Sequence, residues 1–289
     1  MTIETSFTQK LVKITPTLTQ PQQKIAAFVL NYPFKVALYS IEEFATAVGT
    51  STASANRFAK ALGYSGYAPF RQDLIKGFES VLDSVHRLKD GQRTSNSIQE
   101  VFTNALLETE KNLSVTRHNL NQESCEKAVQ MILGAKRIFI LGFGSSAYLS
   151  GIMERRLFPY KDMVLSLSSP GGIAEAARRL TFVDEKDLII AISFPRYLLD
   201  TIQLARNAIQ KGAQVLALTD KLTAPIAPIA HCVLYAKSGT QFGQNSEAST
   251  LALIEALMAG IDYSSNHAVE LATEMAQTLT PWLVSPNSP

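Results

Sequence analysis

Cysteine is scarce in this chain of 289 residues, which contains only Cys125 and Cys232. The two thiols lie far apart in the sequence, and neither belongs to a CxxC pair or a histidine-rich segment. This distribution argues against a disulfide framework and against a structural zinc site. We therefore expect no metal, and we expect both cysteines to be buried as small apolar side chains.

Long hydrophobic runs are also lacking. The sequence contains no run of about 18 apolar residues and no basic-then-apolar export signal, so we expect a cytoplasmic protein without a membrane span. No repeat or low-complexity tract stands out. The length and the 46% hydrophobic content are enough to fill two cores, which predicts a two-domain chain.

The net charge of +2 hides an asymmetry between the two parts of the chain. Residues 1–96 hold 11 Lys plus Arg against 7 Asp plus Glu (net +4), and the remaining 16 against 18 give −2. The basic excess therefore lies in the N-terminal part. A surplus of this size is common on solvated helical surfaces, so it indicates little by itself.

Residues 40–63 carry the signals of a helix-turn-helix. Ser40 and Glu43 form the Ser-x-x-Glu pattern of a capping box at the start of a first helix. Its buried face is predicted at Ile41, Phe44, Ala45 and Val48. Gly49 can adopt the positive φ of the bend, and Ser51 is a plausible N-cap for a second helix from Thr52 to Leu62.

The second helix has the composition of a DNA recognition helix. Its predicted outer face contains no acidic residue and consists of Thr52, Ser54, Asn56, Arg57 and Lys60. Small polar residues allow close approach to base edges, and a carboxylate near phosphates would weaken binding. We expect the first four to contact bases or backbone, and Lys60, with Arg71 and Lys76, to contact phosphates. An ordinary helical hairpin is the second interpretation.

Residues 19–77 resemble the N-terminal domain of the RpiR family of bacterial transcription regulators. The matching motifs are SIEEFA at 40–45, STASANRF at 51–58 and LGYSGY at 62–67. Phe44 stands where the family usually has Leu, and Ser54 where it has Thr; both departures are conservative. The resemblance implies a DNA-binding transcription regulator.

The pattern changes from helical to mixed along the chain. Thr19 and Gln22 predict a cap for a helix that runs to about Leu30 and is closed by Pro33. Helices then dominate to about Lys89, and two more are expected between 97 and 133. Short apolar runs alternate with helical segments at Arg137–Phe143, Met163–Leu167, Asp187–Ile192, Gln214–Leu218 and His231–Tyr235.

This alternation predicts an α/β two-domain chain. An all-α helix-turn-helix domain is expected at 1–90, a polar linker at 91–96, and an effector-binding and oligomerisation domain at 97–289. The second domain should be a doubly wound five-stranded parallel sheet with flanking helices. Ligands of such sheets bind at the carboxyl ends of the strands, which directs attention to the loops after Phe143 and Ile192.

The first loop contains Gly142, Gly144, Ser145 and Ser146 between a strand and a helix. Backbone amides and hydroxyls at a helix N-terminus can bind an anion. The string is also a Gly-x-Gly-x-x-Ala dinucleotide fingerprint, but Ser166, Ser168 and Ser169 stand where an acidic ribose partner would be needed. We therefore expect no cofactor. A tight turn without a ligand stays an alternative.

Residues 137–266 resemble the sugar isomerase (SIS) domain of the RpiR family. The resemblance implies a domain that senses a phosphorylated sugar and alters DNA binding. The family's second phosphate loop aligns with 193–198, where only Ser193 is retained and Pro195, Arg196 and Leu198 depart from the pattern. Either the Arg196 guanidinium replaces the lost donors, or the loop binds another ligand or none.

Catalysis is the minority interpretation. Glu247, at the start of a helix expected from about Asn245 to Ala259, and His267 are the available bases, and neither has an identifiable partner in the sequence. We expect a regulator, with a sugar-phosphate isomerase as the alternative. Symmetric operators imply at least a dimer, with contacts expected in the helices at 97–133 or 266–280, where Leu271, Met275 and Leu279 form an apolar row. Repression and activation are both compatible with the sequence.

Overall fold

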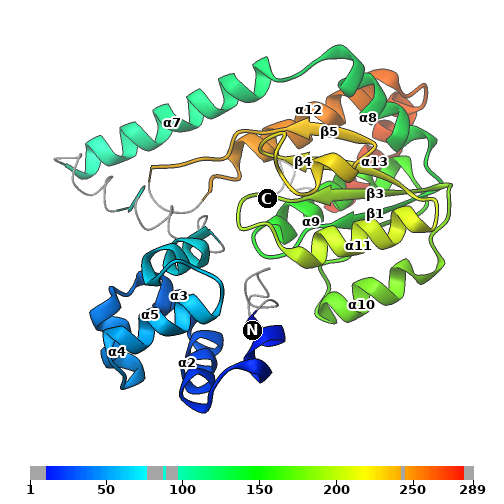
Figure 1. The fold of residues 1–289 in the computed structure, drawn as a ribbon. Coiled ribbons are helices and arrows are strands. Elements are labelled where there is room, and N and C mark those ends of the chain that lie inside the picture. Colours follow the sequence, from blue (N-terminus) through cyan, green and yellow to red (C-terminus); the bar gives the residue numbers. More distant parts are fainter. Residues whose placement is uncertain (1–10, 77–86, 89–96, 242–244, 283–289) are drawn as a thin grey trace. The chain divides into compact units, whose positions relative to one another are not determined.

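The computed structural model describes residues 11–76, 87–88, 97–241 and 245–282 (Figure 1). The chain divides into two compact units, Met1–Lys89 and Asp90–Pro289. The expected linker at 91–96 lies outside the described residues. Within the described ranges, no helix is long and apolar enough to cross a membrane.

The N-terminal unit is helical. After η1 (Thr15–Thr17), its helices are α2 (Gln20–Asn31), α3 (Pro33–Leu38), α4 (Ile41–Val48) and α5 (Thr52–Ala61), and residues 67–76 are also helical. The backbone N–H of Thr19 donates to Gln22 Oε1 at 3.0 Å, which forms the expected cap of α2. Pro33 begins α3 directly after α2 ends, a position that suits its fixed φ and missing N–H.

Aromatic side chains fix the packing of α4, α5 and the helix that follows them. Phe44 stacks on Tyr67 with ring centroids 5.1 Å apart, and Phe58 meets Phe70 edge-on at 5.8 Å. All four rings are buried. Burial of each large apolar side chain contributes about 1.5–3 kcal/mol, so this cluster sets the angle at which α5 is held.

The C-terminal unit contains a five-stranded parallel sheet with the order β2-β1-β3-β4-β5. The strands are β1 (Arg137–Leu141), β2 (Val164–Ser166), β3 (Asp187–Ile192), β4 (Gln214–Thr219) and β5 (Cys232–Tyr235). All six residues of the central strand β3 are buried, as expected for a parallel sheet covered on both faces. The doubly wound parallel sheet expected from the sequence is confirmed.

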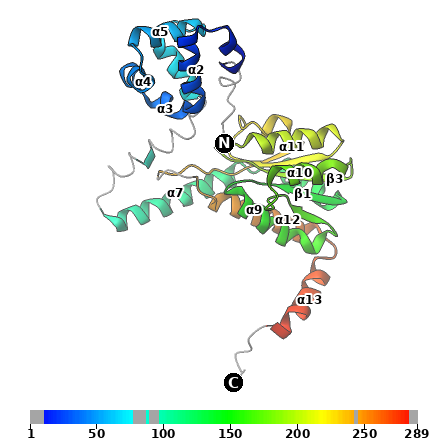
Figure 2. The ribbon, with the colours of Figure 1, turned by 90° about the horizontal axis from the view of Figure 1, so that it is seen from below.

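Helices cover both faces of this sheet (Figure 2). One face packs against α8 (Gln122–Gly134), α9 (Ser146–Leu157) and α12 (Ala248–Ser264), and the other against α10 (Gly172–Arg179) and α11 (Leu199–Gln210). Helix α7 (Ile98–His118) packs on α12, and α13 (Ala268–Leu279) follows it. Strand order reverses between β1 and β3, so the loops after these strands open side by side at the carboxyl edge.

Two local expectations need correction. Helix α12 begins at Ala248 with Glu247 as its N-cap and continues to Ser264, five residues beyond the expected end at Ala259. Cys232 is buried, but Cys125 is only half-buried on α8, so the expectation of two buried thiols is wrong for Cys125.

Candidate DNA-binding surface and ligand pocket

Helices α4 and α5 form the helix-turn-helix expected from the sequence. The Ser40 N–H donates to Glu43 Oε2 at 2.7 Å, and the Glu43 N–H donates to Ser40 Oγ at 3.2 Å, which completes the capping box. Gly49 ends α4 in the left-handed region with φ 69°. Ser51 Oγ then accepts the Ser54 N–H at 3.2 Å and starts α5. Local chemistry therefore fixes both ends of the turn.

The outer face of α5 carries the predicted recognition residues. Thr52, Arg57 and Lys60 are exposed, and Ser54 is half-buried. Arg57 Nη2 donates to Ser54 Oγ at 2.8 Å, one turn earlier on the helix. This bond holds the guanidinium along the helix while its other N–H groups can reach base edges.

Asn56 has a structural role beside its predicted one. Its Oδ1 accepts the backbone N–H of Tyr67 at 2.9 Å, at the start of the helix after α5. The carbonyl oxygen is therefore committed to the fold, and only the amide group is available for DNA. Two predicted phosphate contacts also have partners within the chain: Arg71 Nε donates to the Ala37 carbonyl at 3.0 Å, and Lys76 lies 3.9 Å from Asp73.

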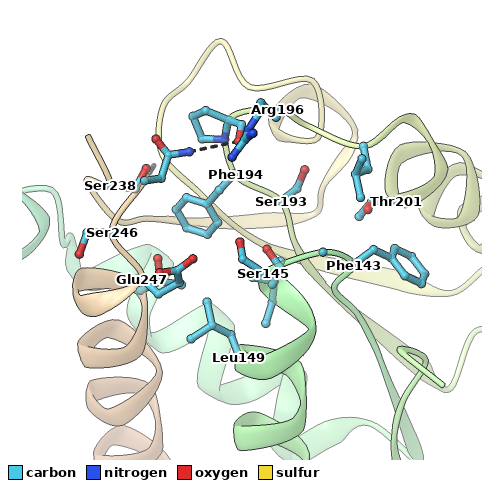
Figure 3. A pocket seen from close by; sticks show the side chains of 17 residues that line it. Phe143, Ser145, Leu149, Ser193, Phe194, Arg196, Thr201, Ser238, Ser246 and Glu247 are labelled. Carbon is cyan, nitrogen blue, oxygen red and sulfur yellow. Dashed lines mark hydrogen bonds between the residues drawn. The ribbon is translucent and has the colours of Figure 1, made fainter. Parts of the chain in front are cut away.

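A pocket of about 400 Å³ lies at the carboxyl edge of the sheet (Figure 3). The loops after β1 and β3 and the segment between β5 and α12 line it. Five of the six residues predicted from sequence line it, namely Gly144, Ser145, Ser146, Ser193 and Arg196. Four further polar residues of the lining, which follow the last strand, were not predicted from the sequence: Ser238, Asn245, Ser246 and Thr250. No motif marks them, because only the strand order brings this segment to the first loop.

Gly142 does not line the pocket, but it supports the first loop. Its carbonyl accepts a hydrogen bond from Ser168 Oγ, and a Cβ added to Gly142 would lie 2.6 Å from the Ser146 carbonyl oxygen. Ser150 Oγ and Ser168 Oγ are 2.9 Å apart, and Ser166 Oγ donates to Ser150 Oγ at 3.1 Å. These serines therefore support the loop at the place where a dinucleotide site would carry its ribose acid.

Three helices begin at the pocket. Lining residues lie at or within the first turns of α9, α11 and α12, among them Ser146, Thr201 and Thr250. A helix N-terminus carries partial positive charge and unpaired backbone N–H groups. Their convergence favours an anionic ligand.

A buried hydroxyl in the pocket has no partner. Ser193 is 3% exposed, lines the pocket, and its Oγ forms no hydrogen bond within the described part of the chain. Leaving a buried polar group unpaired costs about 1–3 kcal/mol. A ligand that bonds to this hydroxyl would recover that cost.

The second loop is held in an unusual conformation. Arg196 has φ 64° and is, among the described residues, the one non-glycine with positive φ. Asn245 Nδ2 donates to the Pro195 carbonyl at 3.1 Å, and Tyr197 Oη donates to Asp220 Oδ1 at 2.5 Å. Burial, together with this bond to Asp220, raises the pKa of Tyr197 well above its usual value, so its hydroxyl stays protonated. Both contacts hold the loop in place around Arg196.

Helix α7 is bonded to the segment that leads from β5 to the pocket. We call residues 236–241 the post-β5 segment. Gln241 N–H donates to Glu108 Oε2 at 2.7 Å, Asn112 Nδ2 to the Gly239 carbonyl at 2.7 Å, and Lys237 N–H to Thr116 Oγ1 at 2.9 Å. The three α7 residues are spaced by four and therefore share one face of the helix. Ser238, within the segment, lines the pocket and accepts the Ser246 N–H at 2.8 Å.

Each of the two units matches a known domain family. Residues 5–80 match the helix-turn-helix domain of the rpiR family, and residues 131–261 match the SIS domain. An uncharacterized HTH-type transcriptional regulator of Haemophilus influenzae is 27% identical over 233 residues, which cover 78% of this chain and 77% of the relative. The HTH-type transcriptional regulator HexR of Pseudomonas aeruginosa is 25% identical over 206 residues, covering 70% and 69%.

A solved structure has the same fold over both units. The Vibrio vulnificus NanR protein complexed with ManNAc-6P matches 96% of this chain and 100% of its own, with a TM-score of 0.59 at 19% identity. The two domain matches follow one another along the chain as a helix-turn-helix domain and a SIS domain. The curated relatives are HTH-type regulators, and the capped α4–α5 motif has the structure of a helix-turn-helix. The chain therefore belongs to the RpiR family and is a DNA-binding transcription regulator with an N-terminal helix-turn-helix domain and a C-terminal SIS domain.

Proposed function

We propose that the SIS-domain pocket binds a small anionic metabolite, a phosphorylated sugar or a related compound, and that this ligand changes operator affinity. The observation that carries the proposal is the pocket itself, in which three helix N-termini and the unpartnered Ser193 hydroxyl meet. That NanR, a protein of the same fold, was solved with ManNAc-6P supports this ligand class. The site of action is the cytoplasm, where a bacterial regulator meets its DNA.

On the DNA side, Thr52, Ser54, Arg57 and the amide of Asn56 are proposed to contact bases or backbone, and Lys60 to contact phosphate. The regulator is proposed to act as a homodimer or higher homo-oligomer, which presents two α5 helices about 34 Å apart, or a multiple of that, to a palindromic site. Exposed apolar side chains on α7 and α13 offer surfaces for this contact: Ile98, Phe102, Leu106, Val269, Met275 and Leu279.

Replacing Arg57 by Ala should weaken operator binding by about 1–3 kcal/mol, because the variant loses a base-edge contact. The measurement selects bound fragments from a genomic DNA pool and titrates the enriched palindrome at fixed salt with both proteins. The salt concentration is fixed because the affinity contributed by phosphate contacts falls steeply as salt rises.

The matched control for Arg57 is Lys24→Ala, which removes one exposed positive charge from α2, outside the helix-turn-helix. It should change affinity little and equally for all sequences. If both variants bound every fragment like the wild type, α5 would not be the recognition helix.

Sensing without turnover is the proposed role of the pocket. Glu247 lines the pocket and keeps isomerisation as the second candidate, because proton transfer beside a carbonyl needs such a base. His267 does not line this pocket; its side chain is 76% exposed and bonds to Glu270. Interconversion of aldose and ketose phosphates by the intact protein, lost in Glu247→Gln, would establish the enzyme instead.

The contact between α7 and the post-β5 segment is the proposed route from ligand to DNA. The segment contributes Ser238 to the pocket, and α7 is the first described element of the C-terminal unit. A ligand that favours one position of the segment would thereby bias α7.

Replacing Asn112 by Ala should reduce the effect of ligand on operator affinity, while ligand binding and ligand-free operator binding are retained. Coupling between two sites is typically about 5–150-fold, and the variant should lose most of it. The check is operator titration with and without saturating ligand. Asn104→Ala removes an amide from the same helix that forms no side-chain hydrogen bond in the described ranges, and it should keep the full response. A full response in Asn112→Ala would place the coupling elsewhere.

A further inference from the structure

We propose that the ligand carries two separate anionic groups, of which the first loop holds one and the Arg196 guanidinium binds the other. Arg196 is then the residue that selects doubly anionic ligands, such as a sugar acid phosphate or a bisphosphate, over simple sugar phosphates. This inference rests on the proposed function and narrows its ligand class.

The backbone of Arg196 is the first observation. With φ 64° it lies in the left-handed region, where a residue with a Cβ costs roughly 1–2 kcal/mol relative to the ordinary helical conformation. Glycine would adopt this conformation without that cost. A strained conformation persists where the surrounding structure enforces it, and such positions gather at ligand sites. The positive φ at Arg196 therefore favours a role for its side chain in ligand binding.

The charges in the pocket are the second observation. Among the described residues that line the pocket, Arg196 is the one cation and Glu247 the one acid. Arg196 forms no hydrogen bond or ion pair with any described residue. Its planar fork of donors matches a carboxylate or a phosphate.

The loop around Arg196 is well anchored on both sides. Thr219 Oγ1 donates to the Ser193 carbonyl at 2.6 Å before it, and the bond between Tyr197 and Asp220 follows it. Asn245 holds the Pro195 carbonyl from across the pocket rim. The guanidinium is thus attached to a fixed backbone, which lowers the entropic cost of binding.

The first loop supplies a different anion position. Gly144 has φ 63°, and Ser145 and Ser146 begin α9 at the pocket wall. Figure 3 shows Arg196 and Ser145 on opposite sides of the pocket, with Phe194 between them. A single phosphoryl group would occupy one side only. The volume of about 400 Å³ accommodates a six-carbon polyol that spans both positions.

Calorimetric titration of the intact protein tests the inference with three probes: glucose 6-phosphate, 6-phosphogluconate and fructose 1,6-bisphosphate. The wild type should bind at least one doubly anionic probe about tenfold or more tighter than glucose 6-phosphate. The acid and bisphosphate arms distinguish a carboxylate from a second phosphoryl group at Arg196.

Arg196→Gly should abolish this preference, because it should lower the affinity for the doubly anionic probes by about tenfold or more and the affinity for glucose 6-phosphate far less. Its thermal midpoint without ligand should rise, because the strained φ is relieved, and this shows that the variant is folded. Arg196→Lys keeps the charge without the planar fork and should retain only part of the preference.

The outcomes separate the two proposals. Equal wild-type affinity for singly and doubly charged probes, unchanged in Arg196→Gly, overturns the inference and leaves the proposed function standing. The same follows if Arg196→Gly keeps the preference. If none of the probes binds to the wild type or to a Ser145→Ala plus Ser146→Ala variant, the proposed function is contradicted. The inference then fails with it.

Discussion

Gly142→Ala should lower the affinity of the pocket for its anionic ligand by about tenfold or more, equivalent to ~1.4 kcal/mol. The new Cβ would lie 2.6 Å from the Ser146 carbonyl oxygen and 3.2 Å from Ser150 Oγ, so the first turn of α9 must move away from the loop. That turn carries the backbone N–H groups and hydroxyls proposed to bind the anion. Titration with the tightest of the three probes measures the loss.

Gly151→Ala is the matched control for this prediction. Gly151 lies in the interior of the same helix, and a Cβ added there would meet no atom within 4 Å beyond the backbone of its own helix. Alanine should therefore stabilise α9 by roughly 1 kcal/mol and leave ligand affinity unchanged. Wild-type ligand affinity in Gly142→Ala would show that the start of α9 does not form the anion site. Operator affinity without ligand should be the same in both variants.

Arg137→Met should destabilise the C-terminal unit by about 3–5 kcal/mol, because it leaves a buried carboxylate without its partner. Asp187 at the start of β3 is 2% exposed. The Arg137 guanidinium donates to its two carboxylate oxygens, from Nε to Oδ1 at 2.7 Å and from Nη2 to Oδ2 at 2.5 Å. The Asp184 N–H donates a further bond to Asp187 at 2.9 Å. The change in the free energy of unfolding is measured by urea titration, with hydrogen exchange in the peptides that cover β1 and β3 as the readout.

The pH dependence of this effect has a definite sign. Burial alone would raise the pKa of Asp187, but the bonds from Arg137 and the Asp184 N–H and the nearby positive charges hold it below its usual value. The wild-type pair therefore stabilises the fold fully above the unfolded pKa of ~3.9, and this contribution is lost as the pH falls through the lower folded pKa. Removal of the guanidinium removes the largest of the causes that lower the pKa of Asp187, so this pKa should rise and the deficit of Arg137→Met should shrink as the pH falls.

The double variant Arg137→Met plus Asp187→Leu provides the control. Replacing a buried ion pair by apolar side chains of similar volume is often neutral or stabilising, so stability should return close to the wild-type value. A deficit in Arg137→Met that grew towards low pH, or a double variant as unstable as the single one, would contradict the role assigned to the pair.

The sequence by itself determined the local features of this protein. The caps at Thr19, Ser40 and Ser51, the bend at Gly49 and the five apolar runs each depend on neighbours a few residues away, so spacing alone predicted them. The two loops that line the pocket were predicted for a different reason: a parallel sheet presents the carboxyl ends of its strands at one edge.

Only the tertiary structure decided which distant groups meet. The strand order brings Ser238 and Asn245 to the first loop, and the packing of α7 on α12 sets α7 beside the post-β5 segment. Asn56 turns its carbonyl to the N–H of Tyr67, a contact across 11 positions that its place on α5 could not reveal. Arg137 meets Asp187 across 50 positions because β1 and β3 pair in that register. Such contacts depend on how packed elements are placed relative to one another, and the spacing of residues along the chain does not determine that placement.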